Sequence, residues 1–379
     1  MSIIVAILGF NVLIVIHELG HYLLAKAVGM RASKFSIGFG PALFRVHGKE
    51  TVFQVALLPL GGYVQLAGMG AGQEGDLPDM LGATPDSRDY NQRPLWQRAL
   101  VVSAGPVFNF VFAIVTYAAL FGSSQAVAFE WKREATTMIR EVSGAAEMAG
   151  LKAYDVIEAV NGDTVSSFGQ LRKIVGEQGH RPLNIKVARS PDGQAPPVQR
   201  IDTEFSGLVL VWPDPPASWP RETITVKPVK TERGYLVGIV PEFARFSTNR
   251  FADAIRLGCA ETWTVTATIF KTLGRWIQGK EDAQVASVVK ITEIGADTVK
   301  MGSEWFLSLL AILSVNLGLL NLLPFPALDG GRLVFIGIEA IARKPVPKRF
   351  ELLIHGVGML ILMSLMLIVV AREIAEKFQ

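Results

Sequence analysis

The stretch that decides the fold is Val15-Ile16-His17-Glu18-Leu19-Gly20-His21-Tyr22-Leu23, which places polar side chains inside the first apolar run of the chain. Residues four apart lie on the same face of a helix, so His17 and His21 can both reach one metal ion while Glu18 stands beside it. Two imidazoles suit zinc, and a neighbouring carboxylate can take a proton from water. The stretch therefore predicts a helix that carries a hydrolytic metal centre.

A chance match must be weighed against this reading, because the chain has five histidines among 379 residues. The His-Glu-x-x-His spacing would arise by chance in about one such chain in a few hundred. Ionisable residues within a membrane span are costly and usually functional, so the location favours a metal site. Of the other histidines, His47 and His180 are expected to be solvated, and His355 to form a hydrogen bond between helices.

Composition indicates a chain that is partly in a membrane and partly in water, since half of its residues are apolar and its mean hydropathy is +0.34. The net charge of +3 is small and the basic residues are dispersed, which argues against nucleic acid as a partner. The single cysteine, Cys259, excludes an internal disulfide and is expected to be buried. The first apolar run follows no basic leader, so we expect it to be retained.

Four stretches are long and apolar enough to cross a bilayer as helices, which takes about 20 residues. They are Ile3 to Val28, Ala99 to Phe121, Trp305 to Leu323 and Leu352 to Val370. Basic residues flank or fill the first and third loops between these spans: Lys26, Arg31, Lys34, Arg45, Lys49, Arg93, Arg98, Arg332, Arg343, Lys344, Lys348 and Arg349. By the positive-inside rule these loops are cytoplasmic, so both termini and the long central segment are expected on the outer side.

The third span ends in Asn321-Leu322-Leu323-Pro324-Phe325-Pro326-Ala327-Leu328-Asp329-Gly330-Gly331. Two prolines break the helix here, and the first and third spans run in the same direction. Asp329 can therefore reach the two histidines, the first of which, His17, lies about 20 Å below Ile3 in the cytoplasmic half of the membrane. Two histidines, one carboxylate and an open position make a catalytic zinc site, although a glutamate as third ligand stays open.

The loop between the first two spans is predicted to form a small sheet or hairpin beside the membrane. Its expected strands are Lys34–Ile37, Ala42–Val46, Thr51–Leu57 and Tyr63–Leu66, and residues 70–92 read as a flexible connector. An exposed edge of this sheet could pair with an unwound substrate, or the segment could be an ordinary amphipathic hairpin on the bilayer.

The second span contains three residues that could pack against neighbouring helices or line a cavity, Gly105, Pro106 and Asn109.

The outer segment is predicted to hold a small α+β domain. Strands are expected at Met138–Val142, Val156–Val160, Leu183–Ala188 and Thr223–Val226, with a helix at Ser167–Val175. The run from Val142 to Leu151, with Asp155–Ile157 and Val160–Gly162, resembles a bacterial PDZ domain over residues 135–230. Tyr154 stands where that family usually has glycine, and the insert from Ser190 to Pro220 leaves the peptide groove unassigned.

As a whole, the sequence predicts an α-helical polytopic membrane protein with four transmembrane helices, a cytoplasmic-side β-hairpin and an extracytoplasmic α+β PDZ-like domain. Amphipathic helices anchored by Trp263 and Trp276 are expected at the outer membrane surface. The expected segments are 1–28, the first span; 29–98, the hairpin loop; 99–121, the second span; 122–240, the PDZ-like region; 241–304, the amphipathic helices; 305–328, the third span; 329–351, a cytoplasmic loop; and 352–379, the fourth span and tail.

Together these motifs resemble the site-2 proteases, the intramembrane metalloprotease family, and within it the bacterial branch of regulators of sigma E. The matching stretches, in order, are His17–His21, Phe35–Pro41, Pro59–Val64, Ala104–Pro106 with Asn109, the PDZ-like core and Asn321–Gly330. The resemblance implies that His17, His21 and Asp329 bind Zn²⁺ and that Glu18 is the general base. It also implies that Asn321, with Gly61, Gly62 and Tyr63, contacts the substrate or the transition state.

The leading hypothesis is thus a zinc-dependent endopeptidase in the bacterial inner membrane. The resemblance implies that it cleaves the transmembrane segments of single-span proteins, such as anti-sigma factors or signal-peptide remnants, in regulated intramembrane proteolysis. Peptide tails would bind the PDZ-like domain, and the lipid bilayer would surround the spans. The alternative is a membrane-anchored PDZ scaffold whose metal site is vestigial.

Overall fold

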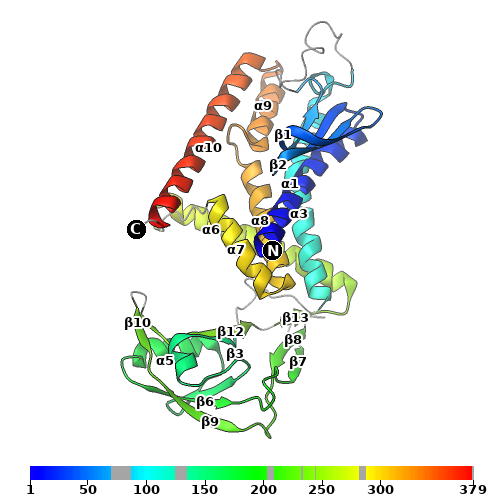
Figure 1. Cartoon of the computed structure of the whole chain (residues 1–379). Helices are drawn as coiled ribbons and strands as arrows, with labels where there is room; N and C mark the ends of the chain where they lie inside the picture. Colours follow the sequence, from blue (N-terminus) through cyan, green and yellow to red (C-terminus); the bar gives the residue numbers. More distant parts are fainter. Residues whose placement is uncertain are drawn as a thin grey trace. The chain divides into compact units, whose positions relative to one another are not determined.

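The computed structural model describes residues 1–69, 87–123, 135–202, 209–231, 234–243, 245–280 and 287–377. The chain divides into two compact units, one formed by Met1–Thr116 with Thr262–Gln379 and the other by Tyr117–Glu261. Figure 1 shows the elements of each unit. Most of the connector predicted at residues 70–92 and the middle of the predicted insert lie outside the described residues.

Four helices among the described residues are long and apolar enough to cross a membrane, as the sequence predicts. They are α1 (Ser2–Ala27), α3 (Leu95–Gly122), α8 (Ser303–Leu322) and α10 (Lys348–Lys377). Helix α8 ends where the sequence requires it, because Leu323 is already extended and Pro324 cannot continue a helix.

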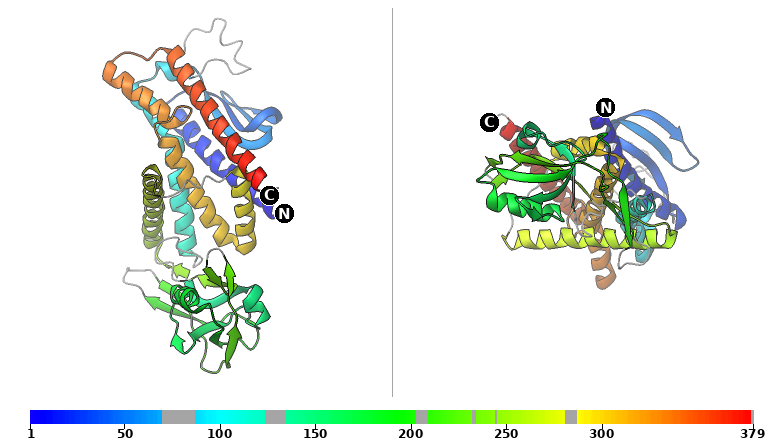
Figure 2. Two further views of the ribbon diagram at one scale, coloured as in Figure 1. Left: turned by 90° about the vertical axis from the view of Figure 1, so that its left-hand side faces the viewer. Right: turned by 90° about the horizontal axis from the view of Figure 1, so that it is seen from below.

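Helices α1 and α8 pack together through a cluster of buried apolar side chains, Ala6, Leu13, Phe306 and Leu310. A shorter helix, α7 (Val288–Met301), contacts both of them (Figure 2). In water, burial of these apolar side chains is the main force that holds the helices together. In lipid, close van der Waals packing takes that role. The result is a fixed frame for the polar residues of α1.

Residues 329–351, predicted as a loop, contain a helix instead. Helix α9 (Asp329–Ala342) begins at the predicted metal ligand, and the residue that follows it, Arg343, adopts a left-handed conformation with φ 53°. Its apolar face packs Leu333 and Ile336 against a core formed by α1, α3 and the hairpin. Burial of this face explains why the segment is helical.

The hairpin consists of two long strands, β1 (Ala32–His47) and β2 (Val52–Leu66). The four short strands predicted here lie within them except for Thr51, which precedes β2. Phe35 pairs with both Val64 and Phe53 because the ribbon curls back on itself. At the turn, the carboxylate of Glu50 accepts hydrogen bonds from Lys26, at 2.8 Å, and from Arg88. These two bonds lower the pKa of Glu50 to about 2, and they tie the turn to the end of α1.

The second unit contains a sheet of strand order β12-β3-β4-β6-β9, with a short β5 (Asp163–Thr164) beside β4. The strands of the main sheet are β12 (Ile239–Phe243), β3 (Ala135–Val142), β4 (Val156–Val160), β6 (Leu183–Ala188) and β9 (Arg221–Val226). Two helices accompany the sheet, α4 (Gly144–Met148) and α5 (Phe168–Gln178). The predicted strands and helix are present, and the PDZ resemblance of the unit stays a prediction.

Other parts of this unit differ from the sequence-based expectations. A three-stranded sheet, β13-β8-β7, and the hairpin β10–β11 were not predicted. Their bounds are β7 (Val198–Asp202), β8 (Val209–Pro213), β10 (Val229–Thr231), β11 (Gly234–Leu236) and β13 (Arg245–Ser247). Tyr154 has φ 68°, so the turn keeps a left-handed conformation without glycine.

The segment expected to hold amphipathic helices forms α6 (Phe251–Ile277) and α7. Trp263, predicted as an anchor, is 72% exposed, and Trp276 is 48% exposed. The expectation that Cys259 is buried is wrong, because it lies on an exposed position of α6. The pattern of exposed aromatic side chains on α6 is typical of a helix that meets a lipid surface.

Candidate metal centre

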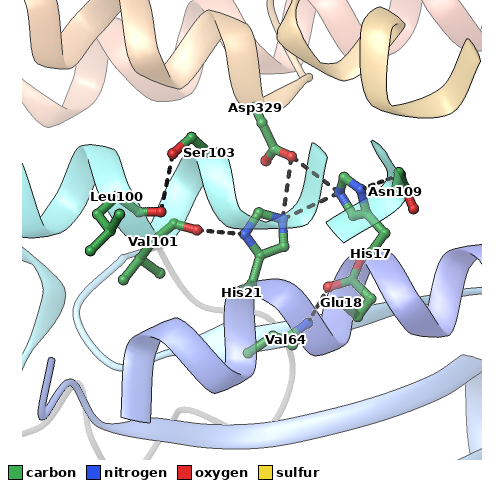
Figure 3. Close-up of polar contacts among 9 residues, drawn as sticks. All are labelled: His17, Glu18, His21, Val64, Leu100, Val101, Ser103, Asn109 and Asp329. Atoms are coloured by element: carbon green, nitrogen blue, oxygen red, sulfur yellow. Dashed lines mark hydrogen bonds and ion pairs between the residues drawn. The ribbon is translucent and has the colours of Figure 1, made fainter. Parts of the chain in front are cut away.

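The centre is built on α1, where one helical turn separates His17 from His21 and brings both imidazoles to the same face. Their Nε2 atoms lie 3.2 Å apart. The Oδ2 atom of Asp329 lies 3.1 Å from Nε2 of His17 and 3.3 Å from Nε2 of His21. Figure 3 shows the carboxylate of Asp329 directed at the two rings. The structure therefore brings together the three residues predicted to bind metal, across more than 300 positions of sequence.

Two contacts hold the segment that carries Asp329. The amide N–H of Ala327 donates to Nδ1 of His355 on α10 at 2.8 Å, and Ala327 itself has a φ of 76°. Farther along α9, Glu339 pairs with Arg98 of α3 at 2.6 Å. Asp329 is thus fixed from two neighbouring helices. His355 forms the kind of packing hydrogen bond that the sequence predicts, with a backbone amide as its partner.

The three ligand atoms fit a zinc ion. Tetrahedral zinc with nitrogen and oxygen ligands at about 2.0–2.1 Å needs ligand atoms about 3.3 Å apart. The separations of 3.1, 3.2 and 3.3 Å match one face of such a tetrahedron and leave a fourth position open. Two imidazoles and one carboxylate are also a donor set that zinc accepts.

Helix α3 closes the site on one side, and glycine is required there. A Cβ atom on Gly105 would lie 2.3 Å from Nε2 of His21 and 2.8 Å from Nε2 of His17, which no real side chain could tolerate. One turn earlier, the carbonyl oxygen of Val101 lies 2.8 Å from Nδ1 of His21. Because a carbonyl only accepts, Nδ1 of His21 must carry the proton, and its Nε2 presents a lone pair to the centre.

Glu18 lies beside the histidines and faces the hairpin. Its Oε2 atom accepts a hydrogen bond of 3.0 Å from the backbone N–H of Val64. Gly62 lies alongside, since a Cβ built there would sit 3.5 Å from Cγ of Glu18. The second strand of the hairpin therefore orients this carboxylate through one of its two oxygens.

A cavity of about 280 Å³ opens onto the centre. Of the residues predicted to contact substrate, Tyr63 and Asn321 line it, Gly62 lies next to Glu18, and Gly61 packs against Phe39 instead. Arg332 also lines the cavity and was missed, because it stands one turn after Asp329 on a helix that the sequence analysis took for a loop. The other lining residues are Ile14, His17, Glu18, His21, Val64, Leu66, Met69, Val101, Val102, Leu317, Ala327, Leu328 and Asp329.

Comparison with known proteins decides the family. The model of peptidase family M50 matches residues 5–365. The chain belongs to this family. A candidate zinc metalloprotease of Agrobacterium fabrum is 31% identical over 381 residues, covering 98% of this chain and 94% of that protein. The zinc metalloprotease RasP of Geobacillus kaustophilus is 28% identical over 449 residues, covering 100% of this chain and 98% of its own length.

Membership in family M50, the zinc-dependent site-2 proteases, makes this chain a metalloendopeptidase. Its four apolar helices agree with a multi-pass membrane protein, and proteases of this family act on membrane proteins within the bilayer. The predicted resemblance and the predicted enzyme class are therefore confirmed.

Proposed function

We propose that His17, His21 and Asp329 hold the zinc ion and that Glu18 is the general base of an endopeptidase cutting inside the membrane. The observation that carries this proposal is the convergence of the three ligand atoms, from α1 and the start of α9, beside the carboxylate of Glu18. When bound, zinc supplies a Lewis acid that polarises the scissile carbonyl and makes water more acidic.

In this mechanism Glu18 moves the proton. Its carboxylate takes a proton from the attacking water as the new C–O bond forms, and gives it to the amide nitrogen as the C–N bond breaks. The Val64 N–H fixes one oxygen of the carboxylate, and the other oxygen would carry this transfer. Asn321 and Tyr63, both on the cavity wall, are suited to hold the peptide.

We also propose that the substrate pairs with the edge of the hairpin near Tyr63. A helical substrate hides its carbonyls in its own hydrogen bonds, so it must unwind before cleavage. An extended segment can then add to an open strand edge. Tyr63, Val64 and Leu66 all line the cavity, which supports this route. Residues that weaken a helix in the substrate should therefore speed cleavage.

The proposed substrates are single-span membrane proteins of the anti-sigma type, or signal-peptide remnants, in regulated intramembrane proteolysis. The basic residues of the first and third loops support a cytoplasmic position for these loops in the bacterial inner membrane, with both termini outside. The α+β unit with its sheet and helix α5 supports a role in binding peptide tails.

The test is cleavage of single-span candidates by the purified protein, with the masses of the products determined. We expect cuts within the membrane span by wild type, and none by Glu18→Gln, which should still bind zinc. Asp329→Asn should lower the zinc content. Cuts outside the span would contradict the proposal, as would equal rates for wild type and Glu18→Gln.

A further inference from the structure

One polar side chain beside the centre has no role in the proposal above. Asn109 of α3 is fully buried, and its Nδ2 atom lies 3.0 Å from Nδ1 of His17. Its Oδ1 atom is also buried and has no hydrogen-bond partner among the described residues. A buried amide oxygen without a partner is costly, so this arrangement calls for an explanation.

The amide can meet His17 in either of two orientations, and the proton on His17 decides between them. If Nδ2 of Asn109 donates to Nδ1 of His17, the ring carries its proton on Nε2, where it can bond to Asp329. That nitrogen then cannot bind a metal. A half-turn of the amide exchanges Oδ1 and Nδ2. Oδ1 then accepts from Nδ1–H, and Nε2 presents its lone pair to the centre.

His21 already has a partner that fixes its proton on Nδ1. Its Nδ1 lies 2.8 Å from the carbonyl oxygen of Val101, an atom that can only accept. Both histidines thus contact α3 through Nδ1. His21 meets the backbone oxygen of Val101, and His17 meets the side-chain amide of Asn109. Metal-binding histidines generally donate their second N–H to such a partner, which fixes the ring and its proton.

We infer that Asn109 is a positioning residue that selects the metal-binding form of His17 by accepting the Nδ1–H through its amide oxygen. This inference rests on the proposed role of His17 as a ligand.

Helix α8 keeps Asn109 in place. The hydroxyl of Ser314 donates to the backbone carbonyl of Asn109 at 2.9 Å. A Cβ on Gly318 would lie 3.2 Å from Cβ of Asn109, so the helices are in close contact there. Both contacts hold Asn109 at a fixed place beside His17.

The test measures zinc affinity by competition with a chelator, using the full-length protein in detergent. Asn109→Leu removes the hydrogen bond at similar size and should weaken zinc binding by about 10-fold to 100-fold. Asn109→Asp restores an acceptor and should bind zinc at least as tightly as wild type. Thr116→Val, a buried polar-to-apolar change on the same helix, is the matched control and should leave affinity unchanged.

A second measurement reports the proton directly. Long-range ¹⁵N–¹H correlation spectra of the zinc-loaded protein with ¹⁵N-labelled histidine should show His17 with its proton on Nδ1. The inference is overturned if Asn109→Leu binds zinc as tightly as wild type, or if the leucine and aspartate variants lose it equally. Zinc binding without cleavage in wild type would instead contradict the proposed function and leave this inference standing.

Discussion

Helices α1 and α10 are both apolar and long enough to cross a membrane, but they are used differently. In α1, 33% of the most apolar window is buried inside the protein, and in α10 only 6% is. Apolar composition therefore identifies which segments can enter a bilayer, and burial identifies which of them build the site.

The residues on the two helices explain the difference. The buried positions of α1 include small or polar residues, among them Gly9, His17 and Gly20, which let neighbouring helices approach closely. Helix α10 exposes large side chains such as Leu360 and Leu367, which suit lipid chains. It meets the site at the loop before Asp329, where His355 bonds to Ala327.

The largest effect is expected at the tightly packed face. Gly105→Ala would drive a methyl group to within 2.3 Å of Nε2 of His21, so the rings must separate. We expect zinc affinity, measured by chelator competition, to fall by about 100-fold or more, since such displacement near a reactive centre is costly. Gly122→Ala on the same helix has open space and should change nothing. Unchanged zinc binding in Gly105→Ala would refute the described packing.

A smaller effect is expected where α10 contacts the loop. His355→Leu leaves the Ala327 N–H without its acceptor, which costs about 1–3 kcal/mol and loosens Asp329. We expect zinc affinity to fall by roughly 10-fold if that cost is felt at the centre. His355→Gln can still accept and should recover part of the loss. Equal loss in both variants would argue that the ring matters only as packing.

The smallest effect concerns two glycines of α10. A Cβ on Gly358 would lie 2.4 Å from Cβ of Pro326, whereas one on Gly356 would meet nothing within 4 Å. Gly358→Ala should lower the free energy of unfolding by about 1–3 kcal/mol. Gly356→Ala should raise it slightly, because alanine favours a helix. Thermal unfolding in detergent measures both, and similar shifts would mean that α10 does not press on the loop.

Much of the site could be predicted because its signals are local. The spacing of His17 and His21 fixes a shared helix face, and the prolines before Asp329 end α8 at a definite point. The spans follow from composition alone. The strands at Val156–Val160 and Leu183–Ala188 were predicted with the bounds that the structure has, because each is a short apolar run between turns.

The remaining contacts could not be predicted, since they depend on backbone atoms or on distant packing. Neither the carbonyl of Val101 nor the N–H of Val64 is marked by any side chain in the sequence. Helix α9 was missed because glycines follow Asp329, and its helical face becomes evident only through the core that it covers. Asn109 was assigned to packing by default, because its position relative to His17 depends on how α3 meets α1.

The bond between Val64 and Glu18 has a mechanical consequence. A strand whose amide is bonded to a carboxylate cannot shift without altering the position of that carboxylate. A substrate chain that pulls the strand toward itself on binding would therefore also move the carboxylate of Glu18. A single hydrogen bond would then link substrate binding to the placement of the general base. A substrate that does not bind correctly would leave the base badly placed and would not be cleaved.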